Sequence, residues 1–252
     1  MEENPLKFDA AKKAEEITEG IKRSFQEKGF SKAILGLSGG VDSSVAAFLL
    51  VRALGKKNVE GLIMPYKEQE TLHAEEVSDI LDIKTERIDI SPMVDAYFSN
   101  FPDADNLRRG NKMARERMSI LFDRSHKTGA LVVGTGNRTE LELGYFTMYG
   151  DGACAVAPLA SLYKTQVFEL ARHLEVPEDI VGKAPSAGLW EGQTDEGELG
   201  ATYLEMDRIL CYIDEGLSTE DITNKGLKES AVKMVRERKR KNRYKLEGPV
   251  FL

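Results

Sequence analysis

The sequence predicts an α/β protein built on a doubly wound parallel sheet, with helices on both faces of the sheet. The first observation is that short apolar segments alternate with amphipathic segments of helical spacing, so that strands and helices follow one another between residues 33 and 90. The second is a loop of serine and glycine between the first strand and the first of these helices. Such alternation favours right-handed crossovers, which place ligands at the carboxyl ends of the strands.

Length and composition favour one domain over residues 1–252, because a chain of this size can bury a substantial core. Apolar runs stay below the ~20 residues that cross a bilayer, and the N-terminus is acidic where a signal peptide would be basic. We therefore expect a cytoplasmic protein with no membrane contact. A net charge of −7 argues against a protein that coats nucleic acid. Cys154 and Cys211 are expected to be buried free thiols.

The N-terminal half supplies most of the expected sheet. A helix over residues 6–28 comes first, because one apolar stripe recurs at helical spacing until Gly29. The apolar run from Ala33 is the first strand, and the strongly apolar helix after the loop stops at Gly55. The next elements are a strand at 59–65, a helix at 69–81 and a strand at 86–90.

The second half adds one strand and several helices. A long helix at 106–127 precedes an apolar strand at 130–134, and further helices are expected at about 165–174, 199–215 and 228–243. We expect the N-terminal helix to pack on a nucleotide-binding α/β core at about 30–180. The irregular segment 185–198, which holds the only tryptophan, is expected to be a lid, and helices fill 199–245.

The loop at 38–43 has the sequence Ser-Gly-Gly-Val-Asp-Ser and indicates an anion site. Glycine lets the backbone approach a ligand, and the first N–H groups of the following helix are unpaired. Asp42 would repel a phosphate unless a cation lay between them, so the loop predicts phosphate together with Mg²⁺. The alternative is an ordinary turn in which Asp42 and Ser43 cap the helix.

The long helix contains an amide that needs partners. Its expected buried stripe consists of Leu107, Asn111, Ala114, Met118, Leu121 and Phe122. Arg115 lies four positions after Asn111, close to it around the helix, whereas Arg117 points to another side. Asn111 and Arg115 could share one anionic ligand. The alternative is that Asn111 binds neighbouring backbone and Arg115 is a solvated surface charge.

Small polar residues follow the fourth strand, at the edge of the sheet where the first loop is expected. Glu140 could meet Asp42 across one metal ion, because Mg²⁺ takes one or two carboxylates together with phosphate oxygens. Thr135 would lie where an adenosine passes. The alternative is that the glycines of this segment only form turns.

Two groups of basic residues admit both a functional and a structural interpretation. Lys164 begins a helix, where its charge is unfavourable to the helix dipole, so it binds phosphate or is simply solvated. The stretch 233–245 has eight basic residues and one acidic residue. It is a phosphate clamp or a solvated helix whose charges suit the dipole.

Taken together, these segments resemble the ammonia-dependent NAD synthetases, within the N-type ATP pyrophosphatases. The matching strings are LGLSGGVDSS at 35–44, NKMARERM at 111–118, GTGNRTE at 134–140, GYFTMYGD at 144–151, YKTQ at 163–166 and PSAGLWEGQTDE at 185–196. They cover nearly the whole chain in the order typical of the family. The resemblance implies an adenine nucleotide alpha hydrolase-like, Rossmann-like fold.

The resemblance also implies roles for individual residues. The ATP contacts would be Gly36, Leu37, Ser38, Gly39, Gly40, Val41, Asp42, Ser43, Thr135, Lys164 and Ser186. Asp42 and Glu140 would bind Mg²⁺, and with Lys164 they would be the catalytic residues. The deamido-NAD contacts would be Asn111, Arg115, Tyr244 and Lys245.

The implied reaction is an amidation of deamido-NAD (nicotinate adenine dinucleotide). ATP adenylates the nicotinate carboxylate and releases pyrophosphate, and ammonia then displaces AMP to give NAD. The family is typically a homodimer. Its glutamine-using relatives carry a glutaminase domain ahead of the synthetase, and only 37 residues precede the loop here. Free ammonia, or ammonia from a separate protein, is therefore the expected substrate.

The chain departs from the family pattern at positions that concern the second substrate. Many members have lysine in place of Met148 and aspartate in place of Ala155, and both are dinucleotide contacts there. The C-terminal motif keeps only Lys245 and Pro249, and Arg238-Lys239-Arg240 is a competing alignment.

Two alternative functions follow from the same loop. The first is another ATP pyrophosphatase, either a GMP-synthetase-like amidase or a tRNA-modifying enzyme. The lack of paired cysteines argues against thiolation, and the acidic balance argues against tRNA. The second is a non-enzymatic nucleotide-binding sensor, which would tolerate loss of Glu140.

Overall fold

The computed structural model describes residues 5–186, 192, 194–248 and 250. Its sheet has four parallel strands, β1 (Lys32–Gly36), β2 (Val59–Ile63), β3 (Lys84–Arg87) and β4 (Ala130–Val133), in the order β3-β2-β1-β4. The chain adds strands in one direction from β1 to β3 and then returns to the other side of β1. Leu35 of β1 is paired with Val133 of β4. The loops that follow these two strands therefore lie side by side, at the point where the strand order reverses.

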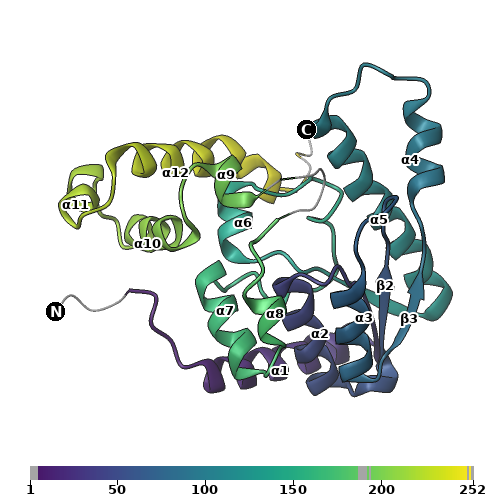
Figure 1. Cartoon of the computed structure of the whole chain (residues 1–252). Helices are drawn as coiled ribbons and strands as arrows, with labels where there is room; N and C mark the ends of the chain where they lie inside the picture. The colour runs from purple at the N-terminus through teal and green to yellow at the C-terminus, as the bar shows by residue number, and fades with distance from the viewer. Residues whose placement is uncertain (1–4, 187–191, 193, 249, 251–252) are drawn as a thin grey trace.

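Helices cover both faces of the sheet, as predicted (Figure 1). One face carries α1 (Ala10–Glu27), α2 (Val41–Leu54), α3 (Leu72–Leu81), α7 (Lys164–His173) and α8 (Glu178–Val181). The other face carries α4 (Ser91–Phe98) and α5 (Asn106–Thr128). Each face of the sheet has its own hydrophobic core. Along β1, Ala33 and Leu35 belong to the core under α1 and α2, and Ile34 belongs to the core under α4 and α5. This alternation is the period-two pattern of a strand buried on both faces.

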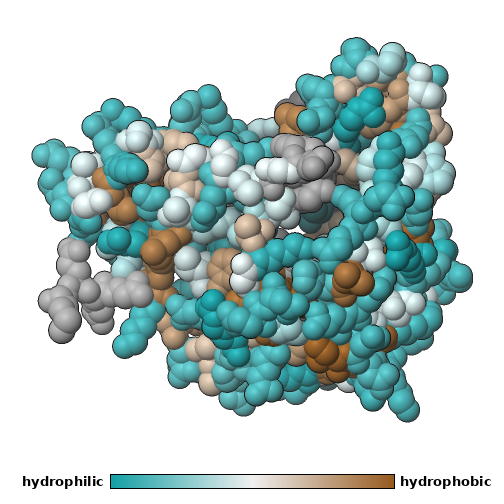
Figure 2. Space-filling view, viewed as in Figure 1, coloured by the Kyte–Doolittle hydropathy of each residue, from teal (hydrophilic) through white to brown (hydrophobic). Residues whose placement is uncertain are grey.

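A third core lies among helices beside the sheet. Its elements are α6 (Arg138–Leu143), α9 (Asp195–Leu199), α10 (Tyr203–Asp214), α11 (Thr219–Asn224) and α12 (Glu229–Asn242). In Figure 1, α10, α11 and α12 extend away from the sheet, and α6 lies where this helical layer meets the α/β part. Two 3₁₀ turns, η1 (Lys56–Asn58) and η2 (Arg243–Leu246), complete the described elements. Figure 2 shows a largely hydrophilic face on which hydrophobic side chains form small separate patches.

The predicted elements are confirmed except at several boundaries. The third strand begins at Lys84 rather than at residue 86 and ends at Arg87, although the N–H groups of Ile88 and Ile90 still reach carbonyls at the end of β2. The predicted helix at 199–215 begins at Tyr203, as α10, because Gly200 at φ +79° ends the shorter helix α9 before it. Helices α4, α6, α8, α9 and α11 were not predicted.

The predicted buried stripe of α5 is partly wrong. Leu107 and Phe122 are 64% and 46% exposed, whereas Gly110 and Met113 are buried. Both cysteines are free thiols, as predicted, but they are half-buried rather than buried. Among the described residues, no helix is long and apolar enough to span a membrane.

Candidate active site

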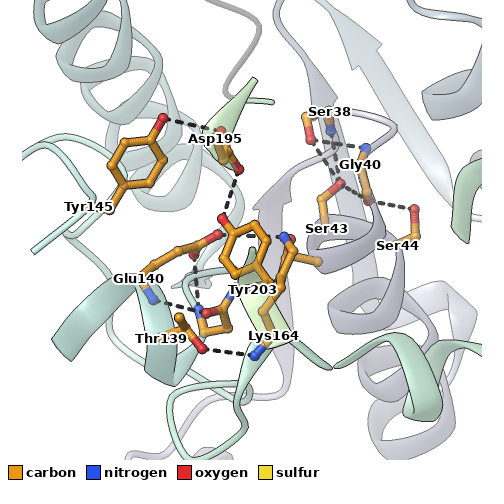
Figure 3. Close-up of polar contacts among 12 residues, drawn as sticks. Ser38, Gly40, Ser43, Ser44, Thr139, Glu140, Tyr145, Lys164, Asp195 and Tyr203 are labelled. Atoms are coloured by element: carbon orange, nitrogen blue, oxygen red, sulfur yellow. Dashed lines mark hydrogen bonds and ion pairs between the residues drawn. The ribbon is translucent and has the colours of Figure 1, made fainter. Parts of the chain in front are cut away.

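The serine–glycine loop is held in place by tight contacts with its neighbours. Gly39 has φ +75°, and a Cβ atom there would lie 2.8 Å from the backbone N of Ala74 and 2.9 Å from Cβ of His73. The hydroxyl of Ser43 donates to the Gly40 carbonyl at 3.0 Å and accepts from the Ser38 N–H at 3.3 Å (Figure 3). Only glycine fits between α3 and the start of α2, so the loop backbone is exposed to whatever occupies the site.

The alternative interpretation of this loop, in which Asp42 and Ser43 cap the helix, is wrong. The residue in the N-cap position of α2 is Gly40, which has no side chain to cap the first N–H groups. The Asp42 carboxylate instead accepts a hydrogen bond from Asn137 at 2.9 Å. The N-terminus of α2 therefore keeps the features of an anion site.

Asn137 joins the two predicted metal ligands and was missed in the sequence. Its amide donates to Asp42, and its Oδ1 accepts from the N–H of Glu140 at 3.0 Å. The Glu140 carboxylate accepts in return from the N–H of Asn137 at 3.1 Å. This reciprocal pair is a capping box at the start of α6, and its Asn-x-x-Glu spacing was the signal that could have identified Asn137.

Lys164 lies between the two carboxylates. It is the first residue of α7 and is only 3% exposed, so the interpretation as a solvated lysine is wrong. Its Nζ contacts Asp42 Oδ2 closely and lies 3.7 Å from Glu140 Oε1. Burial lowers the pKa of Lys164, but the charges of Asp42 and Glu140 outweigh burial and raise that pKa above its usual value. The ammonium group is therefore a fixed positive charge in the site.

The environment of Glu140 favours a further cation. Burial, and then the charge of Asp42, raise the pKa of Glu140 to about 8. Two carboxyl groups converge on one ammonium group, and a further cation would favour the ionised form of Glu140. The available donors are carboxylate oxygens, the ligands that Mg²⁺ prefers. Asp42 and Glu140 therefore fit a magnesium ion bound together with phosphate oxygens.

Residues of α9 and α10 close the site from the helical layer. Tyr203 donates a hydrogen bond to Asp195 at 2.9 Å, and its ring lies 5.3 Å from Nζ of Lys164 (Figure 3). Tyr145 donates to the same carboxylate at 3.2 Å. Asp195 lies in the predicted lid at 185–198, whose residues 195–198 belong to α9. Residues 187–191 and 193 of that lid are outside the described residues.

The other predicted ATP contacts lie along the same edge of the sheet. Gly36 ends β1, and Thr135, which is half-buried, follows β4. Leu37 and Val41 have their side chains in the core, so only their backbone groups can face a ligand. Ser186 is exposed.

Three of the four predicted deamido-NAD contacts form hydrogen bonds with the segment 144–148. Asn111 accepts a hydrogen bond from Thr147 at 2.7 Å, and Arg115 donates to the Met148 carbonyl at 3.2 Å. Lys245 donates to the carbonyls of Gly144 and Phe146, and Tyr244 is 58% exposed. Asn111, Arg115 and Lys245 are thus brought together around one segment.

Lys239, which belongs to the competing alignment of the C-terminal motif, forms ion pairs within the helical layer. Lys239 forms ion pairs with Glu142 at 2.5 Å and Asp214 at 2.8 Å. Asp214 also accepts a hydrogen bond from Tyr163 at 2.9 Å. These contacts join α12 to α6 and α10.

Comparison with known proteins gives consistent matches over most of the chain. The sequence matches the model of the family described as NAD synthase over residues 13–249. It is 47% identical over 252 residues to the NH(3)-dependent NAD(+) synthetase of Fusobacterium nucleatum, a match that covers 98% of each protein.

Two solved structures share the fold over almost their whole length. The structure of NMN synthetase from Francisella tularensis has a TM-score of 0.87 at 33% identity, and covers 98% of this chain and 99% of its own. The NH3-dependent NAD synthetase from Campylobacter jejuni, in complex with the nitrate ion, has a TM-score of 0.83 at 31% identity. That match covers 98% of this chain and 100% of the Campylobacter chain.

Proposed function

The chain belongs to the NAD synthase family, and we propose that it uses ATP and Mg²⁺ to amidate deamido-NAD with ammonia, forming NAD. The observation that carries this proposal is the group of Asp42, Asn137, Glu140 and Lys164 at the ends of β1 and β4. It combines an anion loop, two carboxylates and a buried ammonium group, which suit a nucleotide whose phosphates are bound with a metal ion.

The loop after β1 binds the phosphates of ATP. The unpaired N–H groups at the start of α2 donate to phosphate oxygens, and the absence of a side chain at Gly39 and Gly40 lets the backbone approach. Lys164 lies at the same place with a fixed positive charge. These groups stabilise the negative charge that develops on the departing pyrophosphate.

Asp42 and Glu140 hold the magnesium ion. Asn137 fixes both carboxylates through its side chain and its backbone N–H, so their separation is set before substrate arrives. When bound there, Mg²⁺ neutralises charge on the phosphates. Burial and then the charge of Asp42 raise the pKa of Glu140, and a cation at this place would favour its ionised form.

The reaction has two steps at the nicotinate carboxyl group. One carboxylate oxygen attacks the α-phosphorus of ATP, the bond to the β-phosphate breaks, and pyrophosphate leaves. Ammonia then attacks the carbonyl carbon and loses a proton, and AMP leaves with the carboxylate oxygen that had attacked phosphorus. The chain contributes positioning and charge stabilisation, and no covalent enzyme nucleophile is required.

The second substrate binds along the segment 144–148. Asn111, Arg115 and Lys245 surround this segment, and Tyr244 is exposed beside Lys245. The chain acts as a homodimer. Exposed apolar side chains on α4 and α5, among them Tyr97 and Leu107, support a subunit contact on that face. Light scattering on the purified protein should give twice the chain mass of 28.0 kDa.

A second candidate substrate is nicotinate mononucleotide. The solved structure of the Francisella protein is called NMN synthetase and matches this chain with a TM-score of 0.87. Met148 and Ala155 also lack the polar groups that resemblance to the dinucleotide-using members predicts. The loss of two dinucleotide contacts would matter less for the smaller substrate.

The test is an assay of the purified protein with ATP, Mg²⁺, ammonium and deamido-NAD, followed by chromatography of the products. We expect NAD, AMP and pyrophosphate in equal amounts. A parallel reaction with nicotinate mononucleotide decides between the two substrates by their kcat/KM values. Failure to form AMP with either substrate, under all salt and metal conditions, would contradict the proposal.

A further inference from the structure

We propose that Asp207 of α10 is a positioning residue that sets the distance between Lys164 and Glu140. This inference deepens the proposed function and rests on it. The hydrogen bonds of Asp207 are with Thr139 and Thr165, rather than with the anion loop or the two predicted metal ligands.

Asp207 is fully buried, and both of its carboxylate oxygens accept hydrogen bonds. Oδ1 accepts from the hydroxyl of Thr139 at 2.5 Å. Oδ2 accepts from both the backbone N–H and the hydroxyl of Thr165, each at 2.8 Å. All three groups donate to Asp207, an arrangement that suits a carboxylate.

These partners are the immediate neighbours of the two active-site residues. Thr139 precedes Glu140 in the first turn of α6, and Thr165 follows Lys164 in the first turn of α7. The Thr139 hydroxyl also accepts from the N–H of Lys164 at 2.9 Å. One carboxylate therefore joins the starts of α6 and α7 and fixes Lys164 and Glu140 relative to each other.

Several contacts of Asp207 favour its charged form against the cost of burial. Burial raises the pKa of Asp207 above its usual value, and the hydrogen bonds from both threonines and the charge of Lys164 limit that rise. The N–H of Thr165, in the first turn of α7, is directed at it, and a negative charge is favourable at a helix N-terminus. An asparagine keeps the shape but removes the charge, and its NH₂ group cannot accept the hydrogen bond that a threonine hydroxyl donates here.

Asp207 also connects the site to the helical layer. Tyr203 lies one turn earlier on α10, contacts Asp195 of α9, and has its ring 5.3 Å from Nζ of Lys164 (Figure 3). The same face of α10 thus contacts both Lys164 and the residues that hold it.

The experiment compares Asp207→Asn with Asp214→Asn. Asp214 lies on the same helix and also joins α10 to the starts of α6 and α7. It does so through the ends of the Arg138 and Tyr163 side chains, whereas Asp207 binds the backbone N–H of Thr165 and the hydroxyl that accepts from the N–H of Lys164. For each variant we measure the thermal midpoint, kcat, and the Mg²⁺ concentration that gives half-maximal activity. All kinetics are recorded at a temperature where both variants are folded.

We expect Asp207→Asn to lower kcat about tenfold or more and to raise the half-maximal Mg²⁺ concentration. The KM for ammonium should not change, because Asp207 is fully buried among protein groups. Asp214→Asn should lower the thermal midpoint and keep wild-type kinetics. A structural role for Asp207 alone would lower only the thermal midpoint. Wild-type kinetics in folded Asp207→Asn, or an equal loss of kcat in both variants, would overturn the proposal.

Two further measurements keep the test decisive. If Asp207→Asn does not fold, Thr139→Val removes only the bridging hydroxyl, and near-wild-type kcat and Mg²⁺ dependence would overturn the proposal. If the wild-type protein itself makes no NAD, the proposed function has failed. The positioning role is then decided by Mn²⁺ affinity, measured by electron paramagnetic resonance. Weaker binding by Asp207→Asn than by wild type and Asp214→Asn supports the role, and equal binding contradicts it.

Discussion

Replacing Gly39 by alanine should destabilise the protein strongly, whereas the same change at Gly40 should not. Gly39 has φ +75°, and the left-handed region costs a residue with a Cβ about 1–2 kcal/mol. The new Cβ would also lie 2.8 Å from the backbone N of Ala74, and overpacking of this kind costs about 1–3 kcal/mol. The expected loss of unfolding free energy is therefore about 2–5 kcal/mol.

Gly40 is the matched control. Its φ is −85°, and an added Cβ would meet only the hydroxyl oxygen of Ser38, at an ordinary 3.5 Å. Urea denaturation at neutral pH, with the same m-value for all three proteins, gives the free energies directly. Gly39→Ala should also lower the thermal midpoint by about 5–15 °C. If the two variants unfold within about 0.5 kcal/mol of each other, α3 does not pack on the loop as described.

Three further predictions concern the carboxylates and the C-terminal lysine. Asp42→Asn and Glu140→Gln should each lower kcat at least about 100-fold, or about 2.7 kcal/mol, without change in the circular dichroism spectrum; near-wild-type turnover would remove that residue from the metal site. The folded-state pKa of Glu140, about 8, is above its ordinary value of 4.5, so the metal-free protein should lose stability as the pH rises from 5 to 8. Glu140→Gln should lack that loss, and parallel stability curves for the two proteins would contradict the assignment. Lys245→Met removes the hydrogen bonds that Lys245 donates to two carbonyls of the segment 144–148. It should lower the free energy of unfolding by about 2 kcal/mol and increase the rate of amide hydrogen exchange in that segment. Unchanged exchange would show that Lys245 does not hold this segment.

The sheet and the meeting of Asp42 with Glu140 could be predicted because they depend on local signals and one topological rule. Apolar segments alternate with helices. Where the strand order of a parallel sheet reverses, the loops after the two neighbouring strands lie side by side. Two residues separated by 98 positions were thereby placed at one edge of the sheet. The structure brings both of them into contact with Lys164.

The supporting residues could not be identified in the same way. Asp207 meets Thr139 from 68 positions away, and on an amphipathic helix a buried aspartate has no pattern that distinguishes it from an exposed one. The stripe of α5 was mispredicted for a related reason. Only part of this 23-residue helix is covered, so Leu107 and Phe122 have apolar spacing but remain exposed. Helical spacing predicts which residues share a face of the helix, but it does not predict which part of that face another element buries.

The central claim is that the carboxylate of the second substrate is adenylated before ammonia attacks. The most direct measurement uses deamido-NAD with ¹⁸O in both nicotinate carboxylate oxygens, and mass spectrometry of the AMP that is released. The account predicts that each AMP formed together with NAD carries one ¹⁸O atom in its phosphate. AMP without the label, or NAD formed without AMP, would contradict it.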